Sequence, residues 1–139
     1  ASPDRLELPL RLGVTVIIAH LGSVGKTGGK KNFEMVNEML PRYANLYTDN
    51  SATTEMHRAW ALKASLKQDL MLKRMVYGSD WPVMATPVVS YNYFLPRLGF
   101  KKIKEIKKNK NIWDQDVELK KALGLPAESF ERSEKIIRQ

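Results

Sequence analysis

Cysteine is absent from the 139 residues of the chain, and histidine is nearly so. The lack of cysteine excludes disulfide bonds and thiolate metal sites, so any bound metal ion must use histidine or carboxylate ligands. Only His20 and His57 supply imidazole nitrogen, and no His-x-His pair occurs. The longest uncharged apolar run, residues 14–19, is far shorter than the roughly 20 residues that a membrane-spanning helix needs. We therefore expect a cytoplasmic protein with no membrane partner.

Acidic residues are in the minority, because 23 lysines and arginines outnumber 15 aspartates and glutamates and leave a net charge of +8. Six lysines lie in residues 101–110 beside the single acid Glu105, so a polyanionic partner such as nucleic acid has to be considered. However, Phe100, Ile103 and Ile106 follow helical spacing, which predicts an amphipathic helix whose lysines face water. We therefore do not expect a nucleic-acid partner.

Three apolar segments predict β-strands, at residues 14–19, 45–48 and 74–77. The first is continuous and β-branched, which is typical of a strand buried on both faces of a parallel sheet. Asp49 follows His20 by 29 residues and Asp80 follows Asp49 by 31, and this spacing matches the roughly 30 residues of a βαβ unit. The sequence therefore predicts an α/β fold of parallel βα units.

Helices are predicted around these strands from hydrophobic spacing and from capping residues. An opening helix ends at Gly13 and a second stops at Pro41. Thr53 or Thr54 caps a third helix, which carries Met56. Further helices are placed at residues 91–98, in the lysine-rich segment, and at residues 114–123 and 128–137. We interpret the chain as one domain, with three βα units in residues 1–99 and a helical tail in residues 100–139.

Polar residues follow each predicted strand at the point where it ends. His20 follows the first strand, Asp49 and Asn50 follow the second, and Asp80 follows the third. Because the carboxyl ends of parallel strands meet at one edge of a sheet or barrel, these side chains are expected to lie on the same side. Imidazole nitrogen and carboxylate oxygen are ligands for zinc and similar ions, but a catalytic zinc site usually needs three protein ligands.

These strand ends lie in stretches that resemble strands six, seven and eight of a known family. Residues 16–22 (VIIAHLG), 45–52 (NLYTDNSA) and 74–82 (RMVYGSDWP) are similar, in this order, to the amidohydrolase-related branch of the amidohydrolase superfamily. Members of that superfamily are metal-dependent (β/α)8-barrel enzymes. Residues 112–126 are also similar to C-terminal tails found there. The Gly-Ser-Asp-Trp-Pro string at residues 78–82 is the most specific of these features.

The resemblance implies roles for two residues. Asp80 matches the strand-eight aspartate, which binds the metal ion or acts as a general base. His20 matches the strand-six histidine, which ligates a second metal ion or polarises the substrate. The resemblance also implies a divalent metal cofactor, with zinc as the expected ion. The implied reaction is hydrolysis or decarboxylation of a small carboxylic or carbonyl substrate.

The resemblance further implies that the chain is incomplete as an enzyme. The family's other ligands lie on strands one, four and five, and a closed barrel needs about 250 residues. We therefore expect a C-terminal fragment of a TIM barrel that is inactive alone. Such a fragment is expected to pair with a missing N-terminal half or with itself. His57 lies outside the matching stretches, and we expect it on a solvated surface.

Alternatives follow from the residues themselves. Residues 20–27 (HLGSVGKT) imitate a phosphate-binding P-loop. However, His20 replaces its first glycine, and Gly28 and Gly29 oppose the helix that such a loop requires after its lysine and threonine. A basic polyanion- or nucleotide-binding α/β module is therefore the alternative function. In place of site roles, Asp80 can cap a helix and His20 can be a satisfied strand-end histidine. Trp81 can line a pocket or serve as packing.

Overall fold

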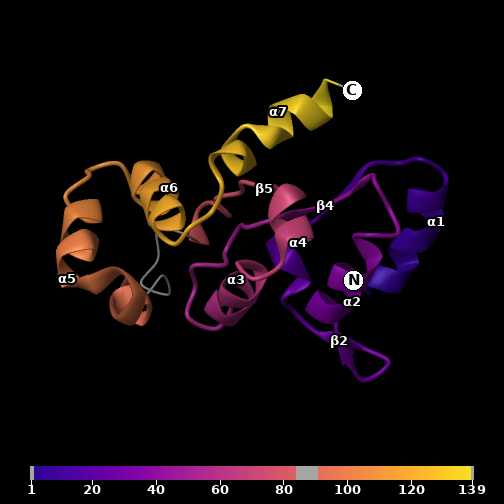
Figure 1. Ribbon diagram of the computed structural model, residues 1–139, viewed down its shortest axis with the longest axis horizontal. Helices are drawn as coiled ribbons and strands as arrows, with labels where there is room; N and C mark the ends of the chain where they lie inside the picture. The colour runs from indigo at the N-terminus through magenta and orange to yellow at the C-terminus, as the bar shows by residue number, and fades with distance from the viewer. Residues whose placement is uncertain (1, 84–90, 139) are drawn as a thin grey trace.

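A three-stranded parallel sheet forms the centre of the computed structural model, which describes residues 2–83 and 91–138. Its strands are β1 (Val16–Ile18), β4 (Leu46–Asp49) and β5 (Met75–Val76), in the order β1-β4-β5. Ile17 pairs with Tyr47 and Thr48 pairs with Met75, both in parallel register. Figure 1 shows the path of the chain through β4 and β5. The predicted α/β arrangement with parallel strands is therefore confirmed, although β1 and β5 are shorter than predicted and β4 is shifted by one residue.

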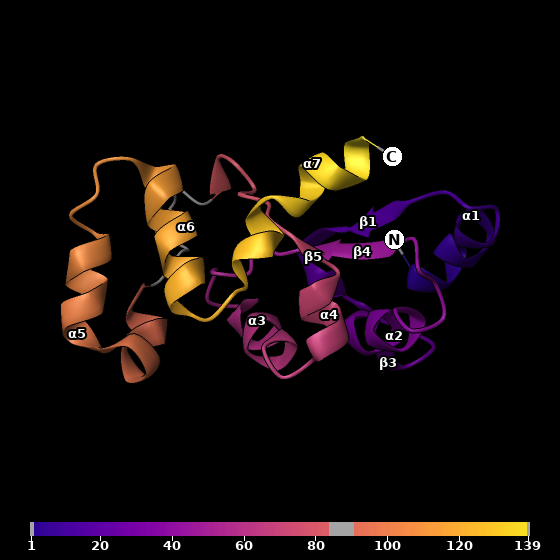
Figure 2. The same ribbon diagram turned by 45° about the horizontal axis from the view of Figure 1, so that its top comes forward.

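One face of the sheet is packed on helices, whereas the other is exposed at β1 and buried at β5, where Val76 is 3% exposed. The connecting helices α2 (Asn32–Met39), α3 (Ala59–Ser65) and α4 (Asp69–Lys73) lie along one side of the strands (Figure 2). Residues whose side chains point to this side are buried, as Leu46 and Thr48 show. Ile17 points to the other side and is 42% exposed. The prediction that the first strand is buried on both faces is therefore wrong for this chain, because the face of β1 that carries Ile17 is exposed.

The two outer edges of the sheet differ. On the side of β5 away from β4, backbone groups are already bonded. Arg132 donates to the Met75 carbonyl, and the N–H of Tyr77, just after the strand, donates to the Ser129 carbonyl over 2.8 Å. These partners come from η5 (Ala127–Phe130) and α7 (Arg132–Ile137). At the opposite edge, no strand in the described part of the chain pairs with the outer side of β1. The sheet thus has one closed edge and one open edge.

The elements before the second sheet strand follow the predictions closely. A 3-10 turn η1 (Pro3–Leu6) leads into α1 (Glu7–Arg11), and α2 ends just before Pro41. The glycine-rich loop adds a small hairpin of β2 (Lys26–Thr27) and β3 (Lys30–Lys31), which the sequence did not predict. Its two-residue turn has positive φ angles of 56° and 82°, which glycine adopts without strain.

The helix expected after the second strand starts later than predicted. Residues 51–58 form turns, and α3 begins only at Ala59, so Met56 lies outside the helix and is exposed. Neither threonine caps the helix. Thr53 Oγ1 donates to the Asn50 carbonyl, and Thr54 Oγ1 donates to Asp116 Oδ1 over 3.4 Å. Contacts with the sheet end and with the tail therefore replace local capping.

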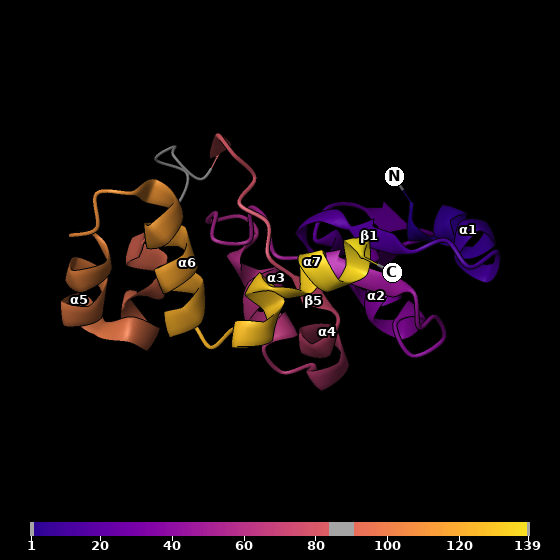
Figure 3. The same ribbon diagram turned by 90° about the horizontal axis from the view of Figure 1, so that it is seen from above.

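The tail is helical, as predicted, with changes at the helix boundaries. It comprises η4 (Tyr91–Phe94), α5 (Leu95–Ile106), α6 (Ile112–Ala122), η5 and α7. Asn111 accepts a hydrogen bond from the Trp113 N–H, so α6 begins two residues earlier than predicted. The segment 128–137 divides into η5 and α7. Figure 3 shows α5 and α6 at the end of the molecule opposite α1. None of the described helices has the length and apolarity needed to cross a membrane.

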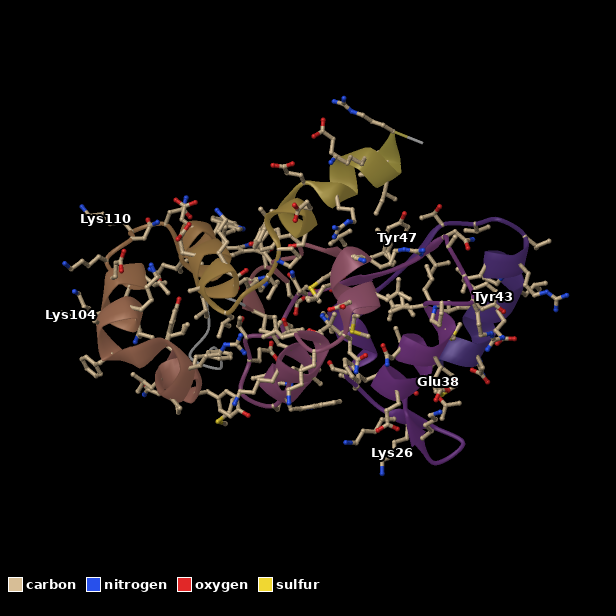
Figure 4. All side chains as sticks on the ribbon, viewed as in Figure 1. Lys26, Glu38, Tyr43, Tyr47, Lys104 and Lys110 are labelled. Carbon is tan, nitrogen blue, oxygen red and sulfur yellow. The ribbon has the colours of Figure 1, made fainter. Side chains whose placement is uncertain are left out.

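The lysine-rich helix α5 is amphipathic, with one correction. Ile103 and Ile106 are buried, whereas most lysines are exposed, and Figure 4 shows Lys104 and Lys110 directed away from the protein. Phe100, which was predicted on the apolar face, is 76% exposed. The helix is interrupted at Gly99, where φ is 73° and ψ is 161°. Phe100 therefore starts a new helical segment and projects beyond the packed face.

One hydrophobic cluster joins the tail to the βα units. Buried members come from α2, α3 and β4, and Leu119 and Leu123 of α6 belong to the same cluster. At the helix-covered side, the Phe33 and Trp60 rings meet edge to face with centroids 5.4 Å apart. Packing of this kind supplies most of the stability of short helices, which are marginal alone.

Two alanine substitutions in α5 test the placement of its side chains. Ile106→Ala removes a side chain that is 4% exposed and is expected to lower the free energy of unfolding by about 2 to 5 kcal/mol. Phe100→Ala, in the same helix, should change it by less than about 0.5 kcal/mol. Urea denaturation followed by circular dichroism measures both. A larger loss for Phe100→Ala would contradict the described packing.

Candidate functional site

Backbone strain is concentrated at the carboxyl ends of the three parallel strands. Four non-glycine residues of the described chain have positive φ angles, between 53° and 59°: His20, Leu21, Ala52 and Asp80. His20 and Leu21 follow β1, Ala52 follows β4, and Asp80 follows β5. Such conformations cost about 1 to 3 kcal/mol each and cluster at active sites and ligand clamps. The edge that the sequence predicted to carry function is therefore also the strained edge.

The Asp49 carboxylate connects the ends of β1 and β4. Its Oδ1 atom accepts hydrogen bonds from the His20 N–H over 2.8 Å and from the Ser51 N–H over 3.0 Å. The Ser51 hydroxyl also donates to this oxygen. Asp49 thus holds the His20 backbone in its left-handed conformation and orients the Ser51 side chain.

The His20 imidazole is oriented by Ser51. Its Nδ1 atom lies 3.0 Å from the Ser51 carbonyl oxygen and 2.8 Å from Ser51 Oγ. A carbonyl can only accept, and the Ser51 hydroxyl proton is already donated to Asp49, so Nδ1 carries the imidazole proton. The lone pair is then on Nε2, which has no hydrogen-bond partner within residues 2–83 and 91–138. His20 therefore presents a basic nitrogen that can bind a cation or accept a proton.

Asp80 lies at the same end of the sheet, and Gly78, two residues before it, packs against the end of β4. The Gly78 N–H donates to Asn50 Oδ1 over 3.3 Å, and a Cβ atom at Gly78 would lie only 2.8 Å from Ser51 Cβ. Glycine is therefore required for β5 and β4 to approach this closely. The half-buried Asp80 carboxylate accepts no hydrogen bond from the described residues. The described chain after Asp80 stops at Val83, so the helix required by the N-cap alternative lies outside the described residues.

The carboxyl ends of the strands offer ligand atoms that suit a divalent cation, but too few of them for a complete site. His20 Nε2 and the Asp80 carboxylate both suit zinc. No hydrogen bond or ion pair joins these two residues, and no group of three histidines and acids that could hold a metal ion occurs among the described residues. The Asn50 Nδ2 amide nitrogen is buried there without a partner in the described chain, so the hydrogen bonding of the edge is incomplete.

A small cavity adjoins His20. It has a volume of about 240 Å³, and its lining includes Ile18, Ala19 and His20 together with Ser2, Pro3 and Asn32. Drug-sized ligands occupy roughly 300 to 1,000 Å³, so this cavity suits only a small molecule or part of one. The histidine therefore borders a space that a small substrate could enter.

The P-loop alternative does not match the local structure. Lys26 and Thr27 lie in the first strand of the hairpin, and the next helix begins only at Asn32. The Thr27 hydroxyl donates to Asn32 Oδ1 over 2.7 Å. A P-loop instead places its lysine and threonine at a helix N-terminus, where backbone N–H groups surround phosphate. The glycine-rich segment of this chain therefore does not form that phosphate site.

A buried ion pair from the tail lies beneath the strand ends, and the sequence analysis missed it. The Lys120 side chain is 0% exposed and its Nζ atom donates to Asp116 Oδ2 over 2.8 Å and to the Gly78 carbonyl over 2.9 Å. The Tyr77 hydroxyl donates to the same Asp116 oxygen over 3.0 Å. The i, i+4 spacing of Asp116 and Lys120 is equally typical of an exposed helix pair. No sequence signal distinguishes the two cases.

Burial perturbs the ionisation of this network. Burial, followed by the negative charge of Asp116, raises the pKa of Tyr77 above its ordinary value. Burial lowers the pKa of Lys120, while Asp116, Asp49 and Asp80 act in the opposite direction. These three carboxylates therefore favour the charged form of Lys120 and oppose the effect of its burial.

Trp81 and His57 lie away from these contacts. The Trp81 ring stacks on Trp113 with centroids 4.5 Å apart, and both rings are about half exposed. Trp81 thus packs against the tail, next to Asp80 in the chain. His57 is exposed, as expected, and its Nε2 lies 3.1 Å from Glu55 Oε2, but it sits in a turn and not in the predicted helix.

Comparison with known proteins identifies the family. The amidohydrolase family model matches residues 7–91, which is more than half of the chain and includes His20, Asp49 and Asp80. The chain therefore belongs to the amidohydrolase family, and the resemblance seen in the sequence is confirmed. No curated protein and no solved structure matches it.

The ion pair beneath the site gives a stability prediction. Asp116→Asn leaves the Lys120 ammonium buried without its nearest carboxylate, so we expect the free energy of unfolding at pH 7 to fall by about 3 kcal/mol. Glu118→Gln is the matched control, because Glu118 pairs with Lys121 at the surface of the same helix, and should cost less than about 1 kcal/mol. Urea denaturation measures both changes. Equal losses would show that the buried pair contributes no more to stability than the exposed pair.

Tyrosine ionisation provides a test by pH. In the unfolded chain each phenol loses its proton at about pH 10, whereas the pKa of Tyr77 and that of Tyr91 are raised by burial in the fold. Their contribution to stability is thus complete below the unfolded pKa and is lost as pH rises through the folded one. An ultraviolet titration of tyrosinate should show two of the five tyrosines ionising late. Tyr77→Phe should remove one of them, and simultaneous ionisation of all five would contradict the burial.

Proposed function

We propose that this chain supplies the last three βα units, strands six to eight, of a (β/α)8 barrel. Three features support the proposal: the strands are parallel, the face of β1 that carries Ile17 is exposed, and no strand of the described residues pairs with the outer edge of β1. A closed barrel needs about 250 residues, and the present 139 provide three of its strands. On this proposal residues 1–99 form the βα units, and residues 100–139 form a helical tail of the same domain.

The missing strands would have to join both edges of the sheet. The open edge of β1 can accept a parallel strand directly, from the N-terminal half of the barrel or from a second copy of the chain. At β5, the Tyr77 N–H is bonded to the Ser129 carbonyl, and the Met75 carbonyl is bonded to Arg132. Closure at this side therefore requires that η5 and α7 move away from β5. We propose that the chain is inactive until the missing strands are supplied.

The proposed activity is hydrolysis or decarboxylation of a small carboxylic or carbonyl substrate in the cytoplasm. The orientation of His20 carries the proposal, because Nδ1 is bonded to Ser51 and the Nε2 lone pair is left available at the strained edge. An Nδ1–H bonded to a backbone carbonyl is the usual support of a metal-ligating histidine. Asp80, at the end of the neighbouring strand β5, has a carboxylate that can accept a proton from water and return it to the substrate.

A divalent ion, for which zinc is our proposal, supplies polarisation of a carbonyl oxygen when it is bound. His20 Nε2 and the Asp80 carboxylate are the donors that this chain would contribute. Further ligands would come from the preceding strands, since zinc catalysis usually needs three protein ligands. Asp49 and Ser51 keep His20 in the required tautomer without contacting the reacting atoms.

The decisive first measurement is the intact mass of the protein as its own cell produces it, under denaturing conditions. A mass well above the 15.9 kDa of this chain supports the barrel proposal. A mass equal to 15.9 kDa, together with a monomer in solution, would contradict it, because β1 would then have no strand to pair with.

In that longer protein we expect Asp80→Asn to lower kcat by roughly 100-fold or more, because the amide cannot accept the proton. His20→Ala should reduce the bound zinc as measured by elemental analysis. His57→Gln is the control, since His57 lies at an exposed turn, and it should leave both values unchanged. Full turnover in Asp80→Asn would refute the assigned role.

A further inference from the structure

Lys120 is a fully buried cation directly beneath the candidate site. Its side chain comes from α6 and is 0% exposed, yet it carries a charge that is costly to remove from water. Among the described residues its Nζ atom bonds two oxygens, one from Asp116 and one from the Gly78 carbonyl. The Tyr77 ring lies over the same ammonium, with its centroid 4.9 Å from Nζ.

The contact with Gly78 places the lysine against a residue that lies two positions before Asp80 in the chain. Gly78 is held from one side by Ser51 and Asn50 at the end of β4. From the other side its carbonyl accepts the Lys120 hydrogen bond. Two residues later Asp80 adopts a φ of 59°, in the left-handed region that is less favourable for residues with a Cβ atom. The peptide group between Gly78 and Ser79 is therefore clamped just before the strained residue.

The charges of nearby carboxylates also connect Lys120 with the candidate site. The charges of Asp116, Asp49 and Asp80 all favour the protonated ammonium of Lys120. Two of these three carboxylates lie at the strand ends, and the third lies on the same helix as the lysine. The Lys120 ammonium is thus attracted to acids at the strand ends as well as to its partner on its own helix.

Stability alone does not account for this lysine. A buried ion pair is commonly no more stabilising than apolar side chains of the same size. Methionine at position 120 would fill similar space without the desolvation cost. The arrangement is therefore better explained by the orientation that it imposes on Gly78 and on the residues that follow.

We propose that Lys120 is a positioning residue for Asp80, so that helix α6 of the tail is part of the active site. By holding the Gly78 carbonyl, it fixes the turn that presents the Asp80 carboxylate at the strand ends. Residue 120 lies outside the region matched by the family model, which ends at residue 91. This inference rests on the proposed function, because it assumes that Asp80 takes part in the reaction.

The test separates positioning from stability by neutralising the pair as a whole. In the double variant Lys120→Met/Asp116→Asn no unpaired charge is buried, and the asparagine oxygen can still accept from the Tyr77 hydroxyl. Lys121→Met is the matched control, because Lys121 is the neighbouring, exposed lysine of the same helix. Urea denaturation is used to verify that both variants fold.

The first readout is an NMR spectrum of the full 139-residue chain. The Gly78 carbonyl and the Ser79 N–H share one peptide group, so loss of the Lys120 hydrogen bond should shift the Ser79 and Asp80 amide signals in the double variant. The control should leave them in place. Unchanged Ser79 and Asp80 signals in a folded double variant would overturn the proposal.

The second readout is turnover of the longer native protein. A misplaced Asp80 should lower kcat by about 100-fold in the double variant with little change in KM. If Asp80→Asn abolishes turnover but the double variant keeps it, the positioning role is wrong and the proposed function stands. If Asp80→Asn itself keeps turnover, the proposed function fails, and the positioning role fails with it.

Discussion

The hydrogen bonds accepted by the Asp49 carboxylate hold the candidate site together. One oxygen receives the His20 N–H, the Ser51 N–H and the Ser51 hydroxyl. This oxygen joins two strand ends, stabilises a left-handed backbone and sets the imidazole tautomer through Ser51. Hydrogen bonds to a charged acceptor are about twice as strong as neutral ones, so one aspartate can offset much of the strain at His20.

The tail adds hydrogen bonds to β5 and to the residues that follow it. Lys120 contacts the Gly78 carbonyl, while Ser129 and Arg132 bond to the outer side of β5. The third strand is therefore held by β4 on one side and by the tail on the other, whereas β1 has a neighbour on one side only within the described part of the chain. This asymmetry makes the edge of β1 the surface through which the sheet can grow without rearrangement.

Local signals explain which parts of the fold were predictable. The strands, α2 and the lysine-rich helix were predicted because β-branched runs and helical spacing act within a few residues. The predictions for Ile17 and Phe100 failed because exposure depends on which face is covered and on the backbone at Gly99. The expected cap at Thr53 or Thr54 failed because both hydroxyls bond elsewhere in the fold.

The sequence by itself determined the parallel βα order, the family, and the placement of His20 and Asp80 at strand ends, because these depend on residue type and spacing along the chain. Only the tertiary structure showed that Ser51 orients the imidazole and that Lys120 is buried beneath Gly78. The residues involved are 31 and 42 positions apart in the chain. Contacts over such separations depend on how the strands and the tail pack, and spacing along the chain does not encode that packing in a readable form.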